Sequence, residues 1–232
     1  MELILDKKPK NVIIIEGFPG FGLVSTIATE YLISHINADQ IGKIVIEEIP
    51  PIIAVHSGQI IEPIGIFYSK KYNLVVLHAL ASVNGFEWEI SKKVAELAKQ
   101  LTAKEIICIE GIGSVSETNN AFYISDKNAK KFENKIGLTK LKEGIIMGVS
   151  GALMLNKNLN ISCIFAETHS NLPDSRAAAK IIEVLDKYLE LKVDTKPLIK
   201  KAEAFEIKIK DIMEQGKAAS EQKQKKELSY LG

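Results

Sequence analysis

The stretch Val12-Ile13-Ile14-Ile15 runs directly into Glu16-Gly17-Phe18-Pro19-Gly20-Phe21-Gly22, and these eleven residues decide the fold. Consecutive β-branched residues without polar alternation predict a strand buried on both faces, typical of a sheet covered by helices. Apolar residues then recur at helical spacing from about residue 23 to residue 36. The glycine-rich segment therefore marks the passage from a strand into a helix.

Strand-like and helix-like segments continue to alternate up to residue 191. The sequence predicts strands at 41–46, 105–109, 121–124 and 161–166, helices at 85–101 and 175–191, and a strand-to-helix turn within 144–155. Three β-rich runs, 52–55, 59–68 and 74–78, leave no room for helices between them, so hairpins and a mixed sheet are expected. The pattern predicts an α/β domain over residues 1–191 with a mixed, largely parallel sheet.

The last part of the chain has a different character. Apolar residues spaced by four and three predict an amphipathic helical extension over 192–215 that packs on the body or on a neighbouring subunit, with Leu198, Phe205, Ile209 and Ile212 on its apolar face. A polar, linker-like run follows, so residues 216–232 are predicted to be a flexible tail. The tail ends in Leu228-Ser229-Tyr230-Leu231-Gly232, either an ordinary terminus or a tethered peptide that docks into a partner.

Composition excludes several classes of protein. A chain of 232 residues with 46% hydrophobic residues is long and apolar enough for a large core without disulfides or metals. A formal charge of +1 offers no field for nucleic acid or an anionic membrane. Cys108 and Cys163 sit in apolar runs, no two histidines have metal-ligand spacing, and no signal peptide or membrane span is visible. A soluble cytoplasmic protein without metal or cofactor is expected.

Two glycine-rich segments follow predicted strands, where open α/β sheets bind anions. The first has the spacing G-x-x-G-x-G, which is neither a dinucleotide fingerprint nor a P-loop, so a tight turn or contact surface is favoured over a phosphate site. Its residues are Gly17, Phe18, Pro19, Gly20, Phe21 and Gly22. The second is Glu110-Gly111-Ile112-Gly113-Ser114, where Gly111 and Gly113 would permit a sharp loop or a ligand contact.

Other candidate groups have ordinary structural interpretations. Ser150 follows a turn, but its context is not G-x-S-x-G, so a helix N-cap is favoured over a triad with His169 and Asp174. Glu167 and His169 could act as acid and base, although a loop before a helix is the simpler interpretation. His78 is expected to be a buried histidine, and Trp88 is either an interface anchor or a core residue.

The chain resembles the proteasome assembly chaperone family in its archaeal form, over about residues 10–215. The most specific match is Ile15-Glu16-Gly17-Phe18-Pro19-Gly20-Phe21-Gly22-Leu23-Val24. Weaker ones are Glu110-Gly111-Ile112-Gly113, the helix start Pro173-Asp174-Ser175-Arg176-Ala177-Ala178, and the helical C-terminal extension. The resemblance implies a three-layer α/β/α domain that is homo-oligomeric, non-enzymatic and ATP-independent, and that contacts the proteasome core particle or its α-subunits.

The resemblance also bears on the end of the chain. Family members that bind the assembled core end in a hydrophobic–Tyr–any tripeptide, whose carboxylate meets a lysine between α-subunits. Here Tyr230 is third from the end and is followed by Leu231 and Gly232. Either the register shifts or another surface makes the contact. Two alternatives remain: a nucleoside or phosphate enzyme using the glycine-rich segments, and a scaffold that self-assembles through residues 198–212.

Overall fold

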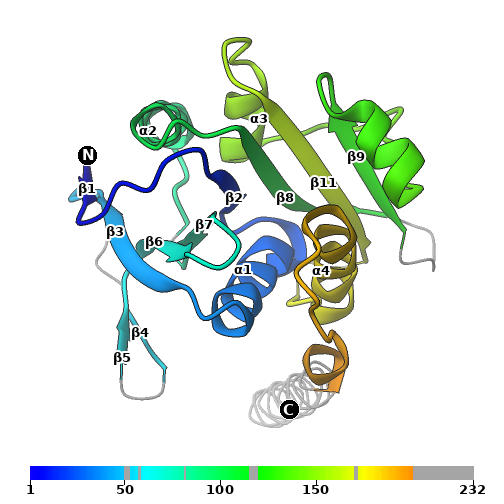
Figure 1. The fold of residues 1–232 in the computed structure, drawn as a ribbon, viewed down its shortest axis with the longest axis horizontal. Helices are drawn as coiled ribbons and strands as arrows, with labels where there is room; N and C mark the ends of the chain where they lie inside the picture. Colours follow the sequence, from blue (N-terminus) through cyan, green and yellow to red (C-terminus); the bar gives the residue numbers. More distant parts are fainter. Residues whose placement is uncertain (50–52, 57–58, 81, 115–119, 170–171, 201–232) are drawn as a thin grey trace, which may run out of the picture.

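The strand predicted from the opening stretch lies at the centre of a nine-stranded mixed sheet. The structure, a computed structural model, describes residues 1–49, 53–56, 59–80, 82–114, 120–169 and 172–200. Strand β2 (Ile13–Gly17) pairs in parallel with β7 (Leu74–Ala79) on one side and with β8 (Glu105–Gly113) on the other. Both sheet neighbours are therefore in place, and β2 has no open edge (Figure 1).

The remaining strands extend the sheet in both directions, in the order β1-β3-β6-β7-β2-β8-β11-β9-β10. Strand β11 (Ile161–Thr168) is parallel to β8, whereas β9 (Ala121–Ser125) is antiparallel to β11. The other members are β1 (Glu2–Leu5), β3 (Asp39–Val45), β6 (Ile64–Ser69) and β10 (Thr139–Lys140). A separate hairpin joins β4 (Ala54–His56) to β5 (Gln59–Ile61). The predicted mixed sheet is confirmed, but it is not largely parallel, because the described strands of this sheet form four parallel and four antiparallel pairs.

Helices cover both faces of the sheet and complete three layers. One face carries α1 (Val24–His35), α4 (Ser175–Leu189) and a π-helical segment, η2 (Lys131–Ile136). The other face carries α2 (Glu87–Gln100) and α3 (Gly148–Met154), as Figure 1 shows. Successive residues of β2 alternate between these layers: Ile14 packs toward α2 and α3, and Ile15 toward α1 and α4. The α/β/α fold is confirmed.

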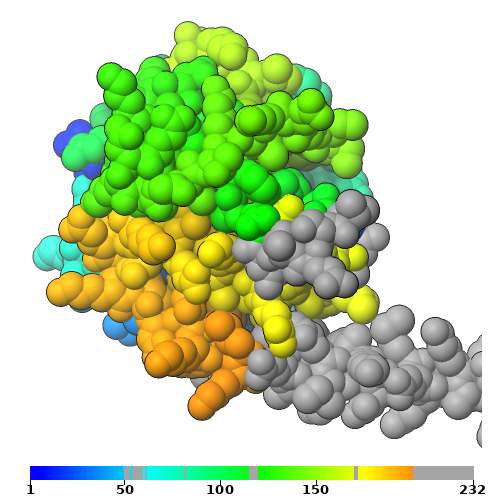
Figure 2. Space-filling model, turned by 90° about the vertical axis from the view of Figure 1, so that its right-hand side faces the viewer, coloured from blue at the N-terminus to red at the C-terminus, as the bar shows by residue number. Residues whose placement is uncertain are grey.

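An aromatic stack that the sequence did not predict fixes the π-helical segment. Phe132 lies between Tyr123 and Tyr188, with ring centroids 4.9 and 4.5 Å apart. The Tyr188 hydroxyl donates to the carboxylate of Glu105, the first residue of β8, at 2.9 Å. Figure 2 shows residues 121–140, in green, lying directly against α4 in yellow and orange. The stack ties the last strands of the sheet to the final described helix.

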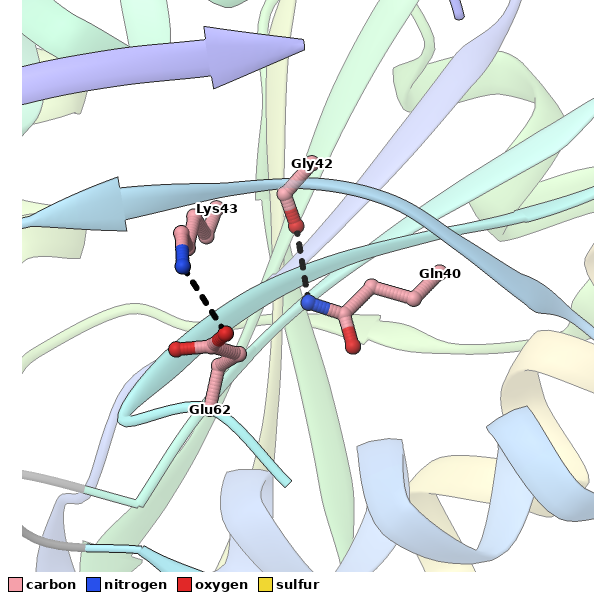
Figure 3. A network of polar contacts seen from close by, with 4 residues as sticks. All are labelled: Gln40, Gly42, Lys43 and Glu62. Carbon is pink, nitrogen blue, oxygen red and sulfur yellow. Dashed lines mark hydrogen bonds and ion pairs between the residues drawn. The ribbon is translucent and has the colours of Figure 1, made fainter. Parts of the chain in front are cut away.

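An irregularity occurs in β3, near the edge of the sheet (Figure 3). The β3–β6 pairing shifts between Gln40 and Gly42, and the Gln40 side chain donates to the Gly42 carbonyl at 3.3 Å there. Beside it, Lys43 and Glu62 form an ion pair at 2.9 Å. A partly exposed pair of this kind contributes little to stability, so backbone pairing holds this edge.

Some predicted boundaries were wrong. Strand β8 does not end at residue 109 but continues to Gly113, because β11 pairs with it up to that residue. Gly111 and Gly113 therefore lie in a strand, not in a sharp loop. Residues 144–147 form no strand before α3. Both cysteines are buried and free, as expected, and no helix among the described residues is long and apolar enough to span a bilayer.

The aromatic stack generates a stability prediction. We expect Phe132→Ala to lower the free energy of unfolding by about 3–5 kcal/mol, because it empties a fully buried site between two rings. The control is Phe122→Ala, at the residue of β9 that precedes Tyr123. Because Phe122 is only partly buried, its replacement should lower the free energy of unfolding clearly less. Chemical denaturation measures both. Equal losses would contradict a specific role for the stack.

Candidate functional site

The carboxyl ends of four parallel strands, β7, β2, β8 and β11, meet at one edge of the sheet. The chain leaves β2 through α1 toward β3, whereas after β8 it continues toward β9 on the opposite side. Where such connections diverge, open α/β sheets form a crevice outside the strand ends. The residues around this point form the candidate site.

Glycines let the segment after β2 pack against its neighbours at this edge. A side chain on Gly17 would come within 2.6 Å of the Thr29 methyl group, and one on Gly20 within 2.6 Å of the Glu110 carboxylate. A side chain on Gly111 would collide with the Phe21 carbonyl. The glycine-rich segment is thus a packing device, as the sequence interpretation favoured, and it lies directly on a carboxylate.

The same segment is anchored to the start of α4. Gly22 has φ of +65°, and a side chain there would meet the Thr168 hydroxyl at 2.8 Å. The Gly22 carbonyl accepts from the Asp174 amide at 2.8 Å, and the Thr168 hydroxyl donates to the Asp174 carboxylate at 2.7 Å. Asp174 also accepts from the Ala177 amide, which makes it the N-cap of α4. The proposed placement of Asp174 at a helix start is confirmed.

Beneath the segment, two glutamates share one serine. The Ser150 hydroxyl, from α3, lies 3.1 Å from Oε2 of Glu16 and 2.8 Å from Oε1 of Glu110. Glu16 is fully buried, and its Oε1 has no hydrogen-bond partner among the described residues. Glu110 is partly buried. Ser150 lies inside α3, so its expected role as a helix N-cap was wrong, and it holds carboxyl groups instead.

Burial shifts the acidity of both carboxyl groups in the same direction. Desolvation raises the pKa of Glu16 to about 7, although the Cys108 thiol, the Ser150 hydroxyl and the Phe18 amide favour the charged form. Desolvation and, second, the neighbouring Glu16 charge raise the pKa of Glu110 to about 8. The pair therefore exchanges protons near neutral pH, unlike ordinary glutamates.

Carboxylates at this position disfavour an anionic ligand. A phosphate bound to the backbone of residues 17–22 would lie near Glu110, which offers no positive charge and repels an anion once it ionises. The hypothetical triad is also not assembled. Ser150 binds the two glutamates, Asp174 binds Thr168 and Ala177, and His169 lies 3.3 Å from the Ser114 carbonyl. The geometry supports neither nucleotide binding nor serine hydrolysis.

The other polar candidates have structural partners. Glu167 accepts from the Ser114 hydroxyl at 2.9 Å and from the Asn120 amide at 3.1 Å, so it fixes both ends of the connection between β8 and β9. His78 is buried and hydrogen-bonds Thr29 at 2.8 Å, as expected of a core histidine, and burial lowers its pKa to about 4. The described residues contain no group of three or more side chains able to hold a metal ion.

Exposed apolar side chains surround the strand ends. They follow β2, lie in the first turn of α2, precede α3 or follow β11, and we call them the apolar rim: Phe21, Leu23, Trp88, Met147 and Leu172. Their exposed fractions run from 36% at Phe21 to 77% at Met147. Phe18, by contrast, is buried. Of the two phenylalanines of the glycine-rich segment, Phe18 therefore packs in the core and Phe21 lies at the surface. An edge of this kind suits contact with another protein.

Several predicted site residues lie outside the described residues: Phe205, Ile209, Ile212, Leu228, Tyr230, Leu231 and Gly232. Leu198 is described, and it is buried in the core of its own chain against the α1 and α4 layer. The start of the predicted extension therefore packs on the body. Sequence reasoning passed over Glu16 as a site residue, and its signal was a charged residue continuing a buried apolar strand.

Comparisons with known proteins give a consistent result. A sequence model of the PAC2 family matches residues 14–213. PbaA of Pyrococcus furiosus, an archaeal homologue of proteasome-assembly chaperone, is 31% identical with a TM-score of 0.81, over 97% of this chain and 96% of that chain. PbaB of the same organism, an archaeal proteasome activator, is 18% identical with a TM-score of 0.78, over 91% and 98%, and shows the fold alone. The uncharacterised protein MJ0106 of Methanocaldococcus jannaschii is 27% identical over 89% of this chain and 87% of its own.

The anchoring of the glycine-rich segment can be tested with two glycines of similar conformation. Gly22→Ala places a methyl group against Thr168 at a left-handed residue, whereas Gly137→Ala, at φ of +71°, meets nothing within 4 Å. We expect Gly22→Ala to lower the free energy of unfolding by about 1–2 kcal/mol more than Gly137→Ala, because Gly137→Ala introduces backbone strain without a collision. Denaturant titration compares them. A smaller loss at Gly22 would contradict the close packing.

The buried acids predict the pH dependence of stability. Because the pKa of Glu16 is higher in the folded chain than its ordinary value of 4.5, folding binds a proton between about pH 4.5 and pH 7. The stabilisation is complete at low pH and is lost as the pH rises through about 7. Glu16→Gln should remove a decline on the order of 2–3 kcal/mol in the free energy of unfolding. Exposed Glu96→Gln should leave the decline in place, and an unchanged slope in Glu16→Gln would refute the assignment.

Proposed function

The chain belongs to the PAC2 family, and we propose that it is a non-enzymatic, ATP-independent chaperone or adaptor that binds the proteasome core particle or its α-subunits. PAC2 proteins are proteasome assembly chaperones rather than enzymes. The observation that carries the proposal is the 31% identity to PbaA over nearly the whole of both chains. The two acids beneath residues 17–22 make a poor phosphate site. They therefore agree with the proposed chaperone function and disfavour the alternative of a nucleoside or phosphate enzyme.

The globular contact with the partner falls, in this proposal, on the apolar rim. Side chains such as Trp88 and Met147 gain when another protein covers them, since their burial removes apolar area from water. Phe21 and Leu23 belong to the same surface and are held in position by the anchored segment that carries them. A rigid, preorganised contact loses little conformational entropy when it binds.

The C-terminal tail supplies a second contact. Residues Leu228, Tyr230 and Leu231 follow a polar run whose dozen residues span on the order of 20 Å in a flexible chain. One short apolar tip binds weakly. Several tails on a homo-oligomer, presented together to a ring of α-subunits, gain through effective concentration.

Self-association completes the proposal. The apolar face predicted for the extension begins at Leu198, which is buried in its own chain. Phe205, Ile209 and Ile212 are the positions left for contacts between subunits.

The test is a pull-down of the core particle and of free α-subunits of the source organism. Full-length protein is compared with a chain ending at Ser229, with Phe21→Ser/Leu23→Ser, and with the control Leu155→Ser, an exposed leucine at the other end of α3. We expect full-length and control proteins to bind, and the truncation to weaken ring binding at least about tenfold through lost avidity. The rim variant should weaken both targets.

Each result has a definite meaning. Loss with the truncation alone places the contact in the tail, whereas loss with the rim variant alone places it on the globular edge. Failure of the full-length chain to bind either target would overturn the proposed function. Circular dichroism of each variant confirms that it folds.

A further inference from the structure

Glu16 and Glu110 lie on either side of the Ser150 hydroxyl, and this contact requires a proton on one of the two carboxyl groups. Neither the fold nor the proposed function accounts for that proton. A serine hydroxyl has one hydrogen and can donate it to only one acceptor at full strength. Ser150 nevertheless lies within hydrogen-bond distance of both carboxyl groups. The second contact becomes a hydrogen bond when the other carboxyl group is protonated and donates to Ser150. The arrangement Glu16–Ser150–Glu110 thus holds a shared proton.

Among the residues that the structure describes, the groups that face the pair supply no positive charge to replace that proton. Cys108 faces Glu16 from β8 and contacts Cys163 on β11, and the hydrogen bond with Cys163 together with burial raises the pKa of Cys108, so it stays a neutral thiol. By strand alternation, Glu167 lies on the same face of β11 as Cys163 and adds a further acid. The buried residues of α2 and α3 carry no titratable side chain, and His78 of β7 points to the other face, toward Thr29. Deprotonation therefore leaves buried negative charge without compensation.

The cover of the pair is the glycine-rich segment. Gly20 lies against the outer oxygen of Glu110, so closely that no side chain fits there. Hydrogen bonds anchor the segment at both ends: the Ser25 hydroxyl donates to the Phe18 carbonyl at 2.5 Å, and the Gly22 carbonyl accepts from the Asp174 amide at the start of α4. It also contains two residues in the left-handed conformation, Gly22 and Leu23. This conformation is sterically unfavourable for Leu23, which has a side chain. Residues 18–20 lie outside the strands and helices, and Phe21–Leu23 form only a short 3₁₀ turn before α1.

We propose that the proton shared by Glu16, Ser150 and Glu110 is a latch that keeps residues 20–23 closed over the strand ends, and that its loss in mildly alkaline solution releases them. A doubly charged pair requires hydration, and moving the segment off Glu110 admits water at the smallest structural cost. The raised pKa values of the two acids, about 7 and about 8, place the transition in the physiological range.

Because of the latch, partner binding through the apolar rim should depend on pH. Phe21 and Leu23 are positioned by the closed segment, so its release removes two of the five rim residues from their fixed places. This consequence rests on the proposed function, since it concerns partner binding. The latch itself does not, because it is a property of the isolated chain.

The experiment is amide hydrogen exchange of the full-length protein from about pH 6 to about pH 9, expressed as protection factors that remove the intrinsic pH dependence of exchange. Protection of the amides of residues 20–24 should fall by up to about tenfold per pH unit above the transition, as expected when opening releases one proton. Amides of α4 should keep their protection, which separates local release from global unfolding.

Variants identify the proton. Glu16→Gln and Glu110→Gln should make the protection of residues 20–24 nearly independent of pH. Glu105→Gln is the matched control: this buried glutamate on the same strand has a raised pKa, owing to burial, but binds Ser162 and Tyr188 at the far end of β8. It should leave the pH dependence unchanged.

The wild-type series decides the question even if a variant fails to fold. Protection of residues 20–24 that does not change with pH would overturn the latch, as would a fall that persists in both glutamine variants. No partner is present in this measurement, so its failure would leave the proposed proteasome binding untouched. The pull-down, in turn, can fail while the latch is confirmed.

Discussion

The enclosure of β2 is the constraint on which the rest of the structure depends. The strand is hydrogen-bonded on both edges, and its side chains are buried beneath helices on both faces. The chain that leaves it must pass over the ends of β8 and β11 before α1 can begin. At three positions of that passage a side chain would collide with its neighbours, so Gly17, Gly20 and Gly22 are needed there. The conformation of the candidate site therefore depends on how β2 packs in the core.

The carboxyl pair is the costly feature of this arrangement. An apolar residue at Glu16 would continue the buried strand and would spare the desolvation of an acid. The chain keeps two acids and a serine there, directly beneath a segment that also presents exposed apolar side chains. Departures from good packing of this kind concentrate at functional sites. The chemistry beneath residues 18–23 and the contact surface above them are therefore parts of one region.

Strand and helix positions were predictable where a single local pattern dominated. The burial of β2, the helical spacing of α1 and α4, and the hairpin of β6 and β7 all depend on neighbours in the sequence. The length of β8 was not predictable, because its last residues, Ile112 among them, are strand only through pairing with β11. The π-helical turn at Phe132 likewise depends on Tyr188, far along the chain. Tertiary contacts override local propensity in both cases.

The sequence by itself determined the layer architecture, the family, the passage from strand to helix at residues 17–22, and the residues available for a tail contact. Only the tertiary structure decided that Ser150 joins Glu16 to Glu110 and that Gly20 closes over them. The physical reason is distance along the chain. Periodicity records which face of an element is buried, but the partner across that face comes from another strand or helix. Whether an acid carries a charge is then set by that partner and by the water it excludes.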